Sequence, residues 1–250
     1  MLAKRIITTL MLKNGVLYRS KNFIPDYRYT LNFIDMWSVD EIIILDISRN
    51  ITFKSSYKKN FLDEMKNISK NAYIPITAGG GIRSLNDIEV LLKNGADKIT
   101  LNSACIDNPE IINQASRQFG KQCIVVCIDV KFENNQYCVM QNYGETNTNI
   151  ELNNYIKKVQ DNEAGEIFIQ SIDRDGSLLG YDLNLLNYIK PVVSIPLIIS
   201  SGAGNWGHVK EVLKKDYVSA ASLTNIFHFT EKSIDNLKNY LKNEILIREN

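Results

Sequence analysis

Apolar runs rich in β-branched residues alternate along the whole chain with amphipathic stretches. The runs have the length of buried strands, whereas the stretches between them repeat apolar residues at the 3.6-residue period of a helix. Strands are predicted over Arg5–Leu12, Glu41–Asp46, Ile74–Ala78, Lys98–Asn102, Cys123–Val130, Glu166–Ser171, Leu197–Ser200 and Val218–Leu223. Helices are predicted over Phe61–Asn71, Leu85–Asn94, Pro109–Phe119, Leu152–Asn162, Leu183–Ile189 and Val209–Lys214.

Eight strands that alternate with helices favour an α/β fold, a (β/α)8 barrel, with a doubly wound open sheet as the alternative. No linker or low-complexity tract divides the 250 residues, so one domain over residues 1–250 is expected. Ser84 and Asp87 form a predicted capping box at the start of the helix over Leu85–Asn94. The polar segment Lys131–Asn149 is predicted to form a small hairpin insertion after the fifth strand.

Two segments repeat the pattern of an apolar strand followed by a glycine turn. They are Ile74–Gly81 (IPITAGGG) and Ile195–Gly204 (IPLIISSGAG), offset by almost half of the chain. Ile6–Lys13 and Ile124–Lys131 form a second matching pair. A strand that ends in glycines brings bare backbone N–H groups together, which suits an oxyanion such as phosphate. The sequence thus predicts a barrel of two half-barrel repeats, each with an anion site.

Composition narrows the class of protein. A hydrophobic fraction of 44%, a charged fraction of 23% and a formal net charge of +1 are ordinary for a soluble globular protein and give no field that favours nucleic acid. No apolar run is long enough for a membrane helix, and no cleavage site follows the N-terminal apolar residues. Four cysteines without a CxxC pair indicate reduced thiols in a cytoplasmic protein, and two isolated histidines predict neither a metal nor a cofactor.

Motifs along the chain resemble one family. They are MLAKRII at the start, LDIS, AGGGI, GADKITLNSA, SIDRDG, SGAG and IFHF, and they occur in that order. As a set they resemble the cyclase subunit of imidazole glycerol phosphate synthase over essentially the whole chain. The resemblance implies a (β/α)8 barrel that receives ammonia from a glutaminase partner docked at the N-terminal face. At the opposite face it would split a bis-phosphorylated substrate into imidazole glycerol phosphate and an aminoimidazole nucleotide.

The resemblance also implies two phosphate sites. The first would use Gly80, Gly81, Asn102 and Ser103, and the second would use Gly176, Gly202, Gly204 and Asn225. As an alternative, these glycines only shape tight turns between strands and helices. Ser201 stands where the family usually has a glycine, and Asn225 replaces a usual serine. Asp175 is a further substrate-site residue by resemblance, and Asp46 either positions substrate or hydrogen-bonds loop amides.

The acid–base pair of the family is incomplete here. The resemblance assigns one catalytic aspartate to the end of strand five, which is Asp129, and one to the end of strand one, where this chain has Met11. A thioether does not transfer protons, so that side of the reaction lacks its group. Gln170 also replaces a threonine that faces substrate in the family. The strand-one loop, Tyr18–Arg28, is expected to be shorter than the family loop that closes over substrate.

A ring of four charges at the N-terminal face admits ammonia in the family, and all four are kept here: Arg5, Glu41, Lys98 and Glu166. The alternative role of such a ring is to pair charges buried at the mouth of the barrel. Retention of the ring beside loss of an acid–base group resembles a side branch of the family, which has a strand-one motif of the form LLLK, compared with TLMLK here. That branch is associated with acetamidino groups in bacterial surface polysaccharides.

The leading hypothesis from sequence is therefore a cyclase-like barrel that takes ammonia from a glutaminase for amidination of a nucleotide sugar by a separate amidotransferase. The first alternative is a true histidine-biosynthetic lyase in which Asp129 does both proton transfers. A second is a scaffold without catalysis that activates the glutaminase. The sister isomerase of histidine synthesis ranks last, because it has no need of the charged ring.

Overall fold

The computed structural model describes residues 3–29, 38–49, 56–224 and 233–248. Within these ranges, eight parallel strands close into a barrel in the order β1, β4, β5, β6, β7, β10, β11, β12, and pairing between β10 and β7 completes the circle. Their bounds are Arg5–Lys13, Glu41–Asp46, Ile76–Gly79, Lys98–Leu101, Ile124–Glu133, Glu166–Ser171, Leu197–Ser200 and Ala220–Leu223. The predicted (β/α)8 barrel is confirmed.

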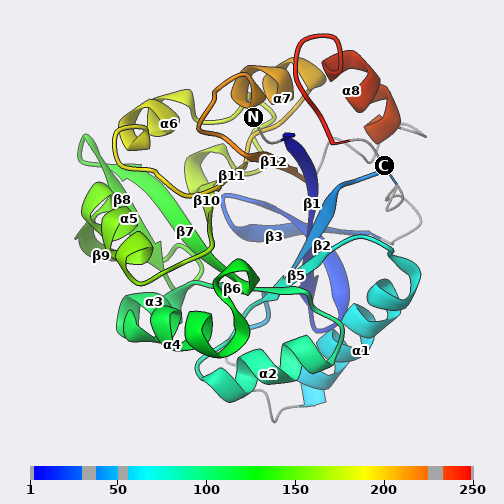
Figure 1. Ribbon diagram of the computed structural model, residues 1–250, viewed down its shortest axis with the longest axis vertical. Helices are drawn as coiled ribbons and strands as arrows, with labels where there is room; N and C mark the ends of the chain where they lie inside the picture. The colour runs from blue at the N-terminus through cyan, green and yellow to red at the C-terminus, as the bar shows by residue number, and fades with distance from the viewer. Residues whose placement is uncertain (1–2, 30–37, 50–55, 225–232, 249–250) are drawn as a thin grey trace.

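Helices surround the barrel (Figure 1). In the described ranges they are α1 (Ser56–Asn71), α2 (Leu85–Lys93), α3 (Ser103–Asp107), α4 (Glu110–Phe119), α5 (Leu152–Asp161), α6 (Leu183–Ile189), α7 (Trp206–Leu213) and α8 (Ser233–Leu241). Ser84 and Asp87 make the predicted capping box at the start of α2. None of the helices described here has the length and apolar character to cross a lipid bilayer.

The core has two layers. Apolar side chains on the outer surface of the strands pack against the helices in one large buried cluster. A smaller cluster fills the inside of the barrel, with Ile7, Ile43, Val125, Cys127, Phe168, Ile198 and Ala220 as its members. This alternation explains why the strands are almost continuously apolar in sequence, since parallel strands inside a helical shell are buried on both faces.

An antiparallel hairpin follows the first strand of each half. After β1, the chain forms β2 (Val16–Lys21) and β3 (Ile24–Tyr29), and after β7 it forms β8 (Gln136–Gln141) and β9 (Thr146–Glu151). The hairpin predicted within Lys131–Asn149 is confirmed. The segment Tyr18–Arg28, interpreted from sequence as a loop, is instead mostly strand, because it pairs with the end of β1.

Other differences lie at element ends. The third strand begins at Ile76, two residues after the predicted start, because Pro75 has no N–H for the sheet. Cys123 belongs to a short 3-10 turn (Lys121–Cys123) that precedes β7. Helix α1 begins at Ser56, before the predicted Phe61, and α3 and α8 were not predicted. All four cysteines are free thiols, as expected.

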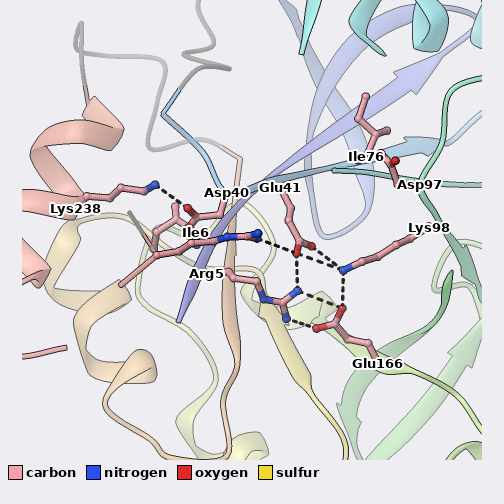
Figure 2. A network of polar contacts seen from close by, with 10 residues as sticks. Arg5, Ile6, Asp40, Glu41, Ile76, Asp97, Lys98, Glu166 and Lys238 are labelled. Atoms are coloured by element: carbon pink, nitrogen blue, oxygen red, sulfur yellow. Dashed lines mark hydrogen bonds and ion pairs between the residues drawn. The ribbon is translucent and has the colours of Figure 1, made fainter. Parts of the chain in front are cut away.

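A buried carboxylate fastens α8 to the barrel. The Asp40 side chain accepts a hydrogen bond from the Ile6 backbone N–H at 2.6 Å and pairs with Lys238 at 2.7 Å. Figure 2 shows this contact beside the amino ends of the strands. Burial raises the pKa of Asp40, and the bonds from Ile6 and Lys238 oppose that shift. The contact joins a helix near the C-terminus to the first strand.

Asp40→Ala is expected to lower the free energy of unfolding by about 3–5 kcal/mol, because it removes the buried carboxylate that pairs with Lys238 and leaves the buried Ile6 N–H without its acceptor. Urea denaturation measures the change. Asp63→Ala is the matched control, since Asp63 is an exposed carboxylate on α1, and its effect is expected to stay within about 0.5 kcal/mol. Equal effects of the two substitutions would show that the Asp40 contact does not hold α8.

Candidate active site

A cavity of about 590 Å³ opens at the carboxyl ends of the barrel strands. Its walls include loops that follow strands in both halves, and the hairpins after β1 and β7 contribute Phe23, Ile24, Asn142 and Tyr143. Because all eight strands are parallel, the residues at their carboxyl ends converge here. Residues of both glycine turns lie in its walls.

The first predicted phosphate site lies on the wall formed by the ends of β5 and β6. Gly80, Gly81, Asn102 and Ser103 all line the cavity. Gly80 has φ +106°, and a Cβ there would lie 2.2 Å from the Asp46 carbonyl oxygen, so no other residue fits. Gly81 has φ +71°. Asn102, however, uses its side-chain N–H to bind Asp129 at 2.8 Å.

Lys58 of α1 supports this wall and was not identified from sequence. Its ammonium group donates to the Gly80 carbonyl at 2.7 Å and pairs with Asp46 at 3.1 Å. Burial lowers the pKa of Lys58, and the Asp46 charge opposes that shift. Lys58, Phe61 and Met65 follow one another at intervals of three and four residues, so Lys58 lies on the buried face of α1. This spacing is visible in the sequence and could have identified Lys58.

The second predicted phosphate site faces the first from β10 and β11. Gly176 (φ +69°) and Gly202 (φ +96°) line the cavity together with Ser201. Ser201 has φ +78°, a left-handed conformation that favours glycine, the residue that the resemblance led us to expect at this position. Gly204 is not in the cavity wall, and its N–H donates to His208 Nδ1 at 3.1 Å. Asn225 lies outside the described residues.

Asp129 lies in β7 where this strand passes from the barrel into the hairpin, since it pairs with Gln170 of β10 and with Met140 of β8, and it is 7% exposed. Its carboxylate accepts hydrogen bonds from Asn102 at 2.8 Å, Gln170 at 3.1 Å and the Cys127 thiol at 3.5 Å. Burial raises the pKa of Asp129 from the usual 3.8 to about 6; the hydrogen bonds lower it and the Asp175 charge adds to the rise. A carboxyl group that titrates near neutral pH is suited to proton transfer.

Met11 lines the same cavity from β1. Its sulfur lies 3.5 Å from the hydroxyl of Ser20, which also donates to Asp175 at 2.7 Å. The Asp175 carboxylate further accepts the Phe23 backbone N–H at 2.9 Å. The structure therefore brings Asp129, Asp175 and Gln170 together with Met11, as predicted, and Ser20 is an addition from the unpredicted hairpin.

The four charges predicted as a ring do contact one another at the amino ends of their strands (Figure 2). Arg5 pairs with Glu41 at 2.8 Å and with Glu166, and Lys98 pairs with Glu41 at 3.1 Å and with Glu166 at 3.4 Å. Burial disfavours the charge on Arg5, but Glu166 and Glu41 outweigh it and raise the Arg5 pKa. Burial likewise opposes the charge on Glu41, while Arg5 and Lys98 lower its pKa.

The ring and the cavity lie at opposite ends of the barrel. Between them, Ile7, Ile43, Val125, Phe168 and Ile198 fill the interior with apolar side chains. Thr9 and Ser222 lie nearer the cavity and share a hydrogen bond of 2.6 Å. None of these residues is charged, so a small neutral molecule between the ring and the cavity would meet only apolar side chains and hydroxyl groups among them.

The fold and the site define a (β/α)8 barrel with a ligand cavity at the carboxyl ends of its strands and a glycine turn in each half. Residues 6–233 match the family model described as histidine biosynthesis protein. The imidazole glycerol phosphate synthase subunit HisF of Hydrogenobaculum sp. (strain Y04AAS1) is 42% identical over 257 residues, covering 99% of this chain and 100% of that protein. The HisF subunits of Natranaerobius thermophilus and Sulfurisphaera tokodaii are each 41% identical over 246 residues, covering 96% of both chains.

The chain belongs to this family of histidine biosynthesis proteins, as a relative of its HisF-type cyclase subunits. The predicted resemblance is thereby confirmed at family level. The names of these relatives favour the histidine-biosynthetic alternative over sugar amidination, which had been the leading interpretation of the sequence.

Stability should depend on pH through Asp129. Since its pKa is higher in the folded chain (about 6) than the usual 3.8, the native state loses stability as pH rises through this interval, by at most about 3 kcal/mol. Asp129→Asn removes the titration, so its free energy of unfolding relative to wild type should rise between pH 4 and about 6.5 and then level off. Urea denaturation at a series of pH values measures this difference. A difference that stays constant with pH would contradict the raised pKa.

Proposed function

We propose that this chain is the cyclase-type synthase subunit of an imidazole glycerol phosphate synthase, and that it uses ammonia on a bis-phosphorylated substrate. The substrate would span the cavity with one phosphate at Gly80 and Gly81 and the other at Gly176 and Gly202. Both turns put left-handed glycines on the cavity wall, and the two walls face each other. Backbone N–H groups in such turns bind phosphate oxygens.

The observation that carries the proposal is the arrangement along the barrel, with a ring of charged side chains at one end and the ligand cavity at the other. The ring of Arg5, Glu41, Lys98 and Glu166 occupies one end, and the cavity of about 590 Å³ occupies the other. The side chains between them are apolar or neutral. We infer that ammonia passes the ring, supplied by a separate glutaminase docked on that face, and reacts in the cavity.

Asp129 is the proposed acid–base group at the reacting centre. Its neutral neighbours Asn102 and Gln170 fix the carboxylate through hydrogen bonds without pairing its charge. The carboxyl group therefore remains free to change protonation state near neutral pH, as its raised pKa indicates.

Met11 favours a second candidate function. If proton transfer at the strand-one position is indispensable for the cyclase reaction, this barrel instead delivers ammonia to a separate amidotransferase that acts on a nucleotide sugar. The intact ring fits both functions, because each requires ammonia to enter. The two differ only in whether the cavity itself makes imidazole glycerol phosphate.

Ammonium chloride at alkaline pH supplies ammonia without a partner, so the purified chain suffices for a test. We expect it to form imidazole glycerol phosphate from the bis-phosphorylated substrate of that synthase. Asp129→Asn should lower the rate by about 10²–10⁴-fold because it removes the proton-transferring group, whereas Met11→Asp should bring little gain. The control Asp63→Asn changes an exposed carboxylate on α1 and should leave the rate unchanged.

Absence of product from wild type, with turnover appearing in Met11→Asp, would contradict the proposal. It would show that the cavity has lost its cyclase chemistry, which is what the amidination candidate requires. The same question can be tested in cells. A histidine auxotroph without its own cyclase subunit should grow when it carries the wild-type gene, and lack of growth would contradict the proposal.

A further inference from the structure

Three carboxylates line the cavity among the described residues: Asp46, Asp129 and Asp175. Asp46 is paired with the ammonium group of Lys58 at 3.1 Å. The other two accept hydrogen bonds only from neutral groups, namely side-chain amides, a thiol, a hydroxyl and a backbone N–H. A carboxylate without a cationic partner keeps both protonation states within reach, so Asp129 and Asp175 are the two groups available for proton transfer.

The hairpin after β1 holds the Asp175 carboxylate in place. Ser20 of β2 donates to its Oδ2 at 2.7 Å, and the Phe23 N–H reaches the same oxygen at 2.9 Å. The Ser20 oxygen also lies 3.5 Å from the Met11 sulfur. One hydroxyl group therefore separates the Asp175 carboxylate from the strand-one position at which the family resemblance expects an aspartate.

We propose that Asp175 is the second proton-transferring residue of this cavity, working with Asp129 in place of a group at Met11, and that Ser20 positions it. This inference rests on the proposed function. When ammonia forms a new N–C bond, its nitrogen loses a proton to one carboxylate. The other carboxylic acid gives a proton to the atom whose bond to carbon breaks, so the protons balance over the reaction.

The surroundings of Asp175 agree with this role. Burial raises its pKa, the bonds from Phe23 and Ser20 oppose the rise, and the charge of Asp26 adds to it. Asp175 in turn raises the pKa of Asp129. Arg19 and Lys21 of the hairpin do not line the cavity, and Arg19 is 3.9 Å from Asp26. Lys13, Arg49 and Arg83 do line it, but the charge that bears on the Asp175 pKa is that of Asp26.

A purely structural role for Asp175 is the competing explanation, since its carboxylate also caps the hairpin turn. Asp175→Asn separates the two roles, because the amide oxygen still accepts from Ser20 and Phe23 but the side chain no longer exchanges a proton. Asp26→Asn is the matched control: it removes a nearby exposed carboxylate of the same hairpin that does not line the cavity.

The test is the pH profile of kcat for these variants with ammonium chloride as the nitrogen source. Asp175→Asn should retain the wild-type thermal unfolding temperature, lose about 10²–10⁴-fold in kcat and lose one limb of the profile. Asp26→Asn should keep both limbs, and Ser20→Ala should shift the limb that Asp175→Asn abolishes. Full rate and both limbs in Asp175→Asn would overturn the inference.

A second measurement is independent of turnover. Carbon-13 NMR of labelled aspartate carboxyl groups follows the Asp129 titration, which should move to lower pH in Asp175→Asn and stay in place in Asp26→Asn. An unchanged Asp129 titration in Asp175→Asn would overturn the inference even if wild type makes no imidazole glycerol phosphate. Lack of product with the expected titration shift would instead contradict the proposed function and leave the coupled carboxylate pair supported.

Discussion

The amino end of the barrel depends on the ion pairs of Arg5, whose guanidinium group is partly buried. It pairs with Glu41 and Glu166, whose side chains are 4% and 8% exposed, and so links β1 to β4 and to β10. Lys98 adds a second bridge between the same two glutamates. Without these cations, two carboxylates would remain buried and uncompensated at the mouth of the barrel, which is costly in any low-dielectric site. With them, the end of the barrel carries balanced charges beside an apolar interior.

At the other end, closure of the barrel determines where the loops after the strands meet. Eight parallel strands deliver their carboxyl ends to one rim, and the loops there are free to vary without disturbing the core. The residues that depart from the pattern expected by resemblance lie at this rim. Met11 and Gln170 line the cavity, and Ser201 adopts a backbone conformation suited to glycine. The hairpin after β1 brings Ser20 and Phe23 to Asp175, so that a carboxylate from the second half of the chain lies beside the first strand.

Much of the fold was readable from sequence because buried parallel strands leave long apolar runs. Glu41–Asp46, Glu166–Ser171 and Leu197–Ser200 have the bounds that their residues predict. The hairpin of β2 and β3 was missed, since the buried and exposed side chains of β2 do not alternate with the period of a strand. Lys58 was missed because charged residues are rarely buried, and here its pairing with Asp46 and its hydrogen bond to the Gly80 carbonyl compensate the burial. The Gly204 N–H is used by His208, four residues further along the chain, and the glycine motif alone did not indicate this local contact.

The central claim is that the cavity holds a ligand by two phosphate groups, one on each half of the barrel. A crystal structure of the chain equilibrated with inorganic phosphate at millimolar concentration tests it most directly. The account predicts phosphate density against Gly80, Gly81 and Ser103, and a second phosphate against Gly176 and Gly202 on the facing wall. Phosphate bound only elsewhere on the surface, with the cavity holding water alone, would contradict it.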